Sequence, residues 1–296
     1  MGTMLGDAPG VARERVLPLH DRSRERRCEG LLRDGQVDAA VEALEALVRD
    51  DDGNAWAHAH LGDLLCVERG EHDAAIHHLS RAIELNDTYG WAFAHRGAAL
   101  ERLDLLDRAE ADFRRALELQ PSNVWARAMS CRVHQLSGRY DAALEELDVV
   151  AREGSTILPD WRAERGLLHM LAGRHEAAHD CYLEALAHDA GDRLALYNVA
   201  INMRRWRGRP AAAPWIERAR TQLLAQPGSP RVTYELGGLL ALEGDADAAI
   251  AHLALAIDAE HGQRLLSPSS KRARIDLAWA TLRDHPRFLV LTRLRV

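Results

Sequence analysis

The sequence has few aromatic residues and almost no lysine. Phenylalanine, tryptophan and tyrosine make up 5% of its 296 residues, and Lys271 is the only lysine. Close packing of the interior must therefore rest mainly on alanine and leucine. The net charge of -7 also argues against a general nucleic-acid binder, because such proteins present a strongly basic face to the phosphate backbone.

Cysteines are few as well, and no long apolar run occurs. Cys28, Cys66, Cys131 and Cys181 include no pair separated by two residues, so we interpret them as small packing residues in a reducing compartment. No stretch reaches the roughly 18 apolar residues of a membrane span, and the N-terminus lacks the apolar segment of a secretory signal. We therefore expect a cytoplasmic protein with no membrane partner.

What the sequence does contain is a pair of helical patterns between Trp91 and Pro121. Small and apolar residues recur every three or four positions from Trp91 to Leu103, as on one face of a helix. After a polar break, a second such pattern begins near Ala109 and ends at Pro121, because proline cannot continue a helix. Gly97 and Ala109 are small enough to be the point where the two helices cross.

The same hairpin recurs along the chain. The residue equivalent to Gly97 returns at intervals of 34 to 37 residues, as Cys28, Gly62, Gly97, Cys131, Gly166, Ala200 and Gly237. The equivalent of Ala109 returns at the same intervals, as Ala40, Ala75, Ala109, Ala143, Ala178, Ala212 and Ala249. Six of the seven turns contain a glycine, namely Gly35, Gly70, Gly138, Gly173, Gly208 and Gly244, whereas the central unit has Asp104 there. One hairpin cannot bury both of its faces, so these registers predict a stack.

These landmarks resemble a tetratricopeptide (TPR) repeat array of the bacterial type over residues 20–263. The resemblance implies an all-α fold, a right-handed α-solenoid of about seven TPR helix hairpins plus a C-terminal capping helix. It also implies that the first helix of each hairpin lines a concave groove, which usually receives a peptide or a partner helix. TPR arrays serve many unrelated roles, so the resemblance specifies the fold more closely than the function.

We divide the chain into a poorly ordered tail (1–19), the solenoid (20–263) and a C-terminal capping segment (264–296). The units span about residues 20–53, 54–87, 88–122, 123–157, 158–191, 192–229 and 230–263. The arginine-rich start of the first unit predicts a solvated end of the array, with an anion site as the alternative. A helix should begin near Pro210, and Lys271 to Arg283 predict a capping helix, with Phe288 to Leu291 packed back on the array.

Trp56, Trp91 and Trp125 share one phase of the repeat and mark the candidate site. In the TPR register this phase lines the groove, and tryptophan is enriched where binding energy concentrates. The alternative is structural, with each ring wedged between neighbouring hairpins. The resemblance implies that the groove is lined by Trp56, Asp63, Trp91, Glu101, Trp125, Arg132, Gln135, Tyr197, Arg204, Arg205, Arg231 and Tyr234.

One string suggests a metal site. His175, Glu176 and His179 spell H-E-x-x-H, a motif that holds zinc on one helix face with the glutamate as general base. The repeat register disfavours this interpretation, because Ala178 between them is the packing alanine and no third ligand is evident. The other histidines lie scattered over several repeats, and we interpret them as surface or interhelical residues. We expect no metal and no cofactor.

Our leading hypothesis is a non-catalytic scaffold or adaptor that binds a peptide or partner helix in the groove. The tryptophans would be apolar anchors, and Arg132, Arg204 and Arg205 would meet acidic groups. The lysine and asparagine of the carboxylate clamp found in chaperone-binding TPR domains are absent from the fifth and ninth repeat positions. Two alternatives remain, a ligand- or peptide-responsive sensor acting on a separate effector and an enzyme with a site in the groove. Partner identity and oligomeric state are left open.

Overall fold

A computed structural model describes residues 19–152, 160–226, 228–260 and 273–292 of the chain. These residues form seventeen helical segments and no strand, so the predicted all-α fold is confirmed. The predicted tail, apart from Leu19, lies outside the described residues, as do residues 264–272 of the capping segment. The chain divides into two compact units, residues 1–126 and 127–296, which are described one at a time.

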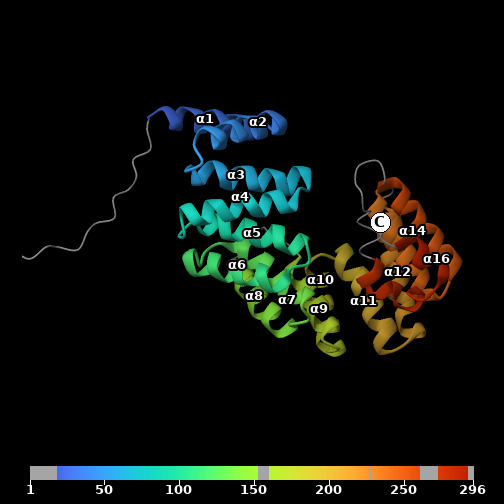
Figure 1. Cartoon of the computed structure of the whole chain (residues 1–296). Coiled ribbons are helices and arrows are strands. Elements are labelled where there is room, and N and C mark those ends of the chain that lie inside the picture. The colour runs from blue at the N-terminus through green and yellow to red at the C-terminus, as the bar shows by residue number, and fades with distance from the viewer. Residues whose placement is uncertain (1–18, 153–159, 227, 261–272, 293–296) are drawn as a thin grey trace, which may run out of the picture. The chain divides into compact units, whose positions relative to one another are not determined.

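The first unit is a stack of helical hairpins. It contains α1 (Leu19–Arg33), α2 (Val37–Asp50), α3 (Ala55–Leu64), the π-helical η1 (Leu65–Arg69), α4 (His72–Leu85), α5 (Gly90–Arg102), α6 (Leu106–Leu119) and the start of α7 (Val124–Leu136). Helices α1 to α6 lie one after another in Figure 1. Their buried faces consist largely of alanine and leucine, as the composition requires.

The two helices of a hairpin meet at the predicted small residues. A Cβ atom added to Gly97 would lie 3.0 Å from the ring of Phe113 and 3.2 Å from the carbonyl oxygen of Ala109. A Cβ atom added to Gly62 in the preceding hairpin would lie 3.0 Å from the carbonyl oxygen of Ala75. The expected contact between Gly97 and Ala109 is therefore confirmed, and any larger side chain would push the helices apart.

The turns between paired helices use the left-handed backbone conformation. All six turn glycines have a positive φ, from 68° to 88°. Asp104 takes their place in the central hairpin with a φ of 62°, and no other non-glycine residue in the described part of the chain has a positive φ. Aspartate tolerates this conformation better than most residues, which explains how the hairpin keeps its turn without glycine.

The second unit continues the helical pairs. It contains α8 (Tyr140–Arg152), α9 (Trp161–Leu171), α10 (His175–His188), α11 (Arg193–Trp206), α12 (Arg209–Leu224), α13 (Pro230–Glu243) and α14 (Ala246–Glu260). Helix α12 carries Pro210 in its first turn, which confirms the predicted start. Among all described residues, no helix is both long and apolar enough to cross a bilayer.

The C-terminal segment differs from the prediction. A single helix from Lys271 to Arg283 was expected, but a 3-10 helix η2 (Leu277–Leu282) is followed by α16 (Pro286–Thr292). The expected helix is interrupted at Asp276, because the backbone of this residue is extended. Asp276 then caps η2, and its side chain accepts a hydrogen bond from the amide of Ala278. Trp279 and Phe288 are buried in the core of the second unit, as expected, whereas Val290 is 71% exposed and faces away from it.

Candidate functional site

Five rings of the first unit form one continuous row, the aromatic ladder, in the order Trp56, His60, Trp91, His95 and Trp125. Successive ring centroids are 4.3, 4.8, 3.7 and 4.7 Å apart. Each ring is half-buried, so the row is fixed by its neighbours and still reaches solvent. The sequence had placed the three tryptophans on one phase but not the two histidines between them.

The helices and the repeat period together build this ladder. Trp56 and His60 lie four residues apart on α3, and Trp91 and His95 lie four apart on α5. Residues at this spacing share a helix face. Because both pairs are separated by 35 residues, stacking the hairpins inserts each histidine between two tryptophans. The signal that could have revealed the histidines was therefore that His60 and His95 are 35 residues apart, as Trp56 and Trp91 are.

Polar contacts hold the ladder in register. The Nδ1 atom of His95 lies 2.6 Å from Oδ1 of Asp63, which joins α5 to α3. The Asn54 side chain caps α3 by accepting a hydrogen bond from the amide of Ala57, and its Nδ2 atom donates to Glu25 of α1. Burial lowers the pKa of His60, while Asp63 opposes that shift. His60 is therefore favoured as a neutral ring between its two tryptophans.

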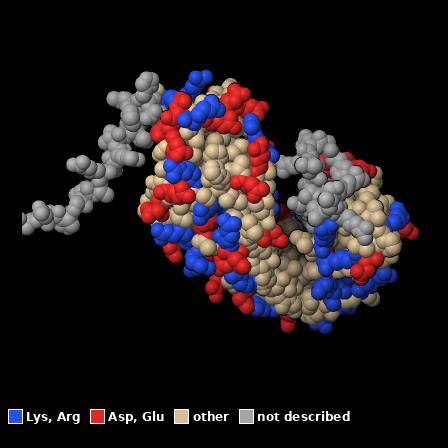
Figure 2. Space-filling model, viewed as in Figure 1, with Lys and Arg blue, Asp and Glu red and all other residues tan. Residues whose placement is uncertain are grey.

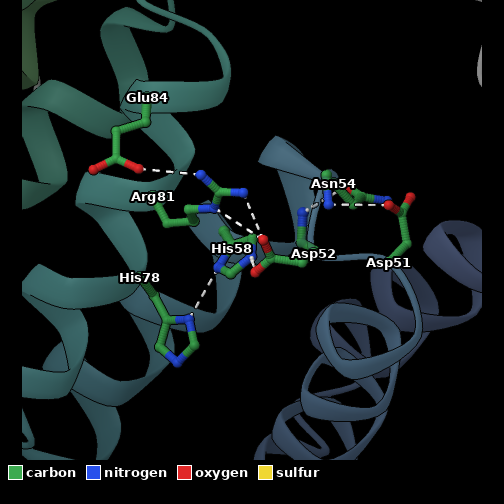
Figure 3. Close-up of polar contacts among 9 residues, drawn as sticks. Asp51, Asp52, Asn54, His58, His78, Arg81 and Glu84 are labelled. Atoms are coloured by element: carbon green, nitrogen blue, oxygen red, sulfur yellow. Dashed lines mark hydrogen bonds and ion pairs between the residues drawn. The ribbon is translucent and has the colours of Figure 1, made fainter.

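A second histidine pair lies between α3 and α4, as Figure 3 shows. The Nδ1 atoms of His58 and His78 are 3.0 Å apart, and Nε2 of His58 lies 3.4 Å from Asp52. Arg81 donates to the same aspartate through two nitrogens and to Glu84 through a third. Burial, together with the neighbouring His58 and His77, lowers the pKa of His78 to about 4. This cluster ties the loop before α3 to the second helix of its hairpin.

The other groove residues predicted between Asp63 and Gln135 have different environments. Asp63 lies beside the ladder, but Glu101 is only 7% exposed and lies 3.9 Å from Nε of Arg102, so the expectation that it lines an open groove is wrong. Arg132 is exposed and Gln135 half-buried on α7.

Two predicted groove residues of the second unit are buried, which corrects the sequence interpretation. Tyr197 is 4% exposed and Tyr234 is fully buried. Their hydroxyl groups donate to Oδ2 of Asp276, at 3.2 and 2.8 Å. Burial raises the pKa of Asp276, although these hydrogen bonds oppose the shift. The C-terminal segment covers the two tyrosines, which the repeat pattern could not indicate because that segment lies outside the repeats.

The predicted arginines of this unit are partly engaged within the protein. Arg231 pairs with the buried Glu235, which Arg193 also contacts. Nε of Arg204 donates to the carbonyl oxygen of Leu242, 3.1 Å away. Arg205, by contrast, is exposed. These arginines therefore do not form one free basic surface.

The H-E-x-x-H string is built into the packing of the second unit. Nδ1 of His175 lies 2.8 Å from Oδ1 of Asn202, whose amide nitrogen donates back to the His175 carbonyl oxygen. The His179 ring lies about 6 Å from the rings of Trp206 and Trp215. Within the described residues, no group of three or more side chains could hold a metal ion.

Surface charge is mixed rather than sorted by sign. Figure 2 shows acidic and basic side chains interspersed over the visible face of the first unit. Many form local pairs, such as Arg96 with the buried Asp112 at 2.7 and 2.8 Å. No one-signed surface of the kind that binds nucleic acid is visible on that face.

Comparisons with known proteins give the family and the fold. Models of the tetratricopeptide repeat family match residues 29–89, 67–124 and 103–163. A comparison with curated protein sequences finds no match.

Many solved structures are similar to this chain, and three of them illustrate the likeness. A tetratricopeptide repeat protein from Parabacteroides merdae has a TM-score of 0.68 at 14% identity and covers 82% of this chain and 94% of its own. The C-terminal part of a TPR protein from Cytophaga hutchinsonii has a TM-score of 0.56 at 12% identity and covers 81% and 96%. YrrB, described as a TPR protein with an unusual peptide-binding site, has a TM-score of 0.52 at 17% identity and covers 71% and 97%.

The repeat period, the close contacts at Gly62 and Gly97, the family matches and the shared fold agree. Residues 29–163 therefore consist of tetratricopeptide repeats, and the chain has the all-α solenoid fold of tetratricopeptide repeat proteins.

Proposed function

We propose that this protein is a non-catalytic scaffold or adaptor that binds an extended peptide or a partner helix of another protein along the aromatic ladder. The observation that carries the proposal is the run of five half-buried rings in contact, from Trp56 to Trp125. Rings already held by their neighbours lose little conformational freedom when a partner binds. Tryptophans in such positions often supply most of the binding energy.

The family and its structural relatives support this proposal. TPR proteins are generally non-catalytic interaction modules, and YrrB is described as having an unusual peptide-binding site. The alternative that the tryptophans only wedge neighbouring hairpins together does not exclude binding. Trp56 and Trp91 pack against the core of the first unit, and each is still partly exposed to solvent. One set of rings can therefore serve both packing and binding.

The test is a selection of random twelve-residue peptides displayed against the whole protein. Peptides retained by the wild type should bind the Trp91→Ala variant about tenfold or more weakly in calorimetric titration, as is typical of a central aromatic anchor. Trp206→Ala is the matched control, because Trp206 is also half-buried but lies in the second unit. Far-UV circular dichroism checks that both variants are folded.

A second variant guards against loss of packing at the ladder. Trp91→Leu keeps an apolar side chain against the core but removes the ring, and it should also weaken binding. Peptides that bind both Trp91 variants as well as the wild type would refute the proposed site.

A further inference from the structure

Two carboxylates, those of Glu29 and Asp63, lie near the ladder, although the first unit as a whole carries charges of both signs. Glu29 is exposed on α1, and Asp63 lies on α3 with its side chain 26% exposed. Asp63 and Glu29 both oppose the lowering of the His60 pKa by burial, and Asp63 is in contact with the next histidine of the ladder, His95.

The carboxylates nearest the ladder are held by nitrogen donors other than arginine. The partner of Asp63 is an imidazole, which carries a full charge only when protonated, and Glu25 accepts its hydrogen bond from the amide of Asn54. Elsewhere in the same unit, Asp52 and Asp112 are paired with the guanidinium groups of Arg81 and Arg96. Asp63 and Glu25 are therefore held by groups with less positive charge than the guanidinium groups that pair with Asp52 and Asp112.

The rings are more strongly tilted at one end of the ladder than at the other. The ring planes differ by 48° between Trp56 and His60 and by 37° between His60 and Trp91. They differ by only 25° and 24° along the rest of the row, from Trp91 through His95 to Trp125. Trp56, His60 and Trp91 are therefore tilted against one another rather than stacked face to face, and Tyr89 also stacks near Trp91, with centroids 6.0 Å apart.

A half-buried aromatic ring next to a carboxylate matches the chemistry of a guanidinium group. Such a group is planar, stacks on an aromatic face and still directs its N–H groups at a carboxylate in the same plane. Lysine offers the charge but not the planar fork. An acidic side chain would instead be repelled by Glu29 and Asp63.

We propose that the tilted end of the ladder, formed by Trp56, His60 and Trp91 with Glu29 and Asp63, is a subsite for a basic side chain of the bound segment, with arginine preferred over lysine. This inference rests on the proposed function and names the chemistry of its partner. It reverses the expectation that arginines of this protein meet acidic groups. Arg204 and Arg231 are engaged internally, whereas the carboxylates at the ladder are accessible.

The composition of the selected peptides provides the first test. Peptides retained by the wild type but lost on Trp91→Ala should be enriched in arginine, and to a smaller degree in lysine. If that pool is acidic or neutral, the ladder still binds peptides and the basic subsite is overturned. If no peptide depends on the ladder, the proposed function fails and the subsite fails with it.

A defined pair of substitutions gives the second test. Replacing the key arginine of a selected peptide by glutamine should weaken its binding to the wild type about tenfold. On the Glu29→Gln, Asp63→Asn double variant the same replacement should cost about twofold or less, because the counter-charges are gone. Asparagine at position 63 can still accept the hydrogen bond from His95, so the ladder keeps its register.

Glu42→Gln is the matched control for charge. Glu42 is exposed on α2, the second helix of its hairpin, and its neutralisation alters net charge without touching the ladder. The tenfold preference for arginine should persist in this variant. An equal preference in the double variant and the wild type would overturn the subsite.

Discussion

The two units place the aromatic rings of their first helices in opposite environments. In the first, the rings on the first helices of the hairpins are half-buried and reach solvent as a ladder. In the second, Tyr197 and Tyr234 occupy the fifth positions of their repeats but are buried beneath Asp276 and Ala278. The fifth positions of the first unit, Ala59 and Ala94, are buried as well, so the rings that reach solvent are those at other positions of the first helices.

Charge compensation differs in the same way. Beside the ladder, Asp63 is held by a histidine and retains 26% side-chain exposure. In the second unit, Glu235 is buried between Arg193 and Arg231, and Asp276 is held by two tyrosine hydroxyls. The first arrangement leaves charge for an incoming group, and the second uses it for internal packing.

The largest expected effect comes from removing the buried ring of Trp279 from the second unit. Trp279 is fully buried, and its ring lies 2.8 Å from the position that a Cβ atom on Gly237 would take. Replacing it with alanine should destabilise the second unit by about 3–5 kcal/mol, the usual cost of removing a buried tryptophan. Hydrogen exchange of the α13 amides should accelerate accordingly.

Trp91→Ala is the corresponding substitution in the aromatic ladder of the first unit. Because Trp91 is only half-buried, the substitution should cost about 1–2 kcal/mol, with faster exchange confined to α3 and α5. Equal losses of stability in the Trp279→Ala and Trp91→Ala variants would contradict the distinction between a buried ring in the second unit and a partly exposed ring in the ladder.

The units should also respond oppositely to acid. The pKa of His78 is about 4 in the folded first unit and about 6.5 in an unfolded chain. The folded state therefore binds fewer protons in this range, so its stability is complete above about pH 6.5 and is lost as the pH falls towards 4. We expect a loss of about 1–2 kcal/mol at pH 5, allowing for solvent near this half-buried ring.

Asp276 has the opposite sign. Its pKa is raised in the folded state, so the folded second unit binds more protons than the unfolded chain and gains stability as the pH falls. Hydrogen exchange at pH 7 and pH 5, corrected for intrinsic rates, should show lower protection in α4 but not in α13. His78→Gln should reduce the loss in α4 and leave the part due to His58, whose pKa is also lowered by burial, whereas parallel losses in α4 and α13 would refute this assignment.

The smallest expected effect concerns the turns. The second unit has glycine in its left-handed hairpin turns, whereas the first has Asp104 in one of its three. Asp104→Gly should therefore stabilise the first unit by about 0.5–1 kcal/mol by removing backbone strain. A rise of a few degrees in the thermal midpoint would show this.

The reverse substitution is available in the second unit. Gly138 has a φ of 72°, and nothing lies within 4 Å of an added Cβ atom. Gly138→Ala should therefore cost about 1 kcal/mol through backbone strain alone. A neutral effect at both positions would show that these turns relax rather than store strain.

Much of the fold could be predicted because its determining contacts are repeated. The small residue at Gly97 and the alanine at Ala109 mark the same helix crossing in each hairpin, and the period makes them visible without coordinates. The start of α12 at Arg209 follows from Pro210 for an equally local reason, since proline fits the first turn of a helix. The capping segment was predicted less well, because Asp276 interrupts the local pattern and its side chain accepts tertiary hydrogen bonds from Tyr197 and Tyr234.

The candidate site could be predicted only in part. The three tryptophans follow from the repeat phase, and Asp63 was placed near them. His60 and His95 were dismissed with the scattered histidines, although they have the same 35-residue spacing. A histidine four residues after a tryptophan is unremarkable on one helix and becomes part of a ladder only when neighbouring helices stack.

The sequence by itself determined the all-α repeat architecture, because each hairpin contact joins residues that recur at intervals of 34 to 37 positions. Only the tertiary structure decided which groove positions remain accessible. Tyr197 and Asp276 are 79 residues apart, and no repeat period relates them. Burial of Tyr197 depends on a segment outside the repeats folding back, whereas exposure of the ladder depends on the edges of its stacked rings remaining uncovered.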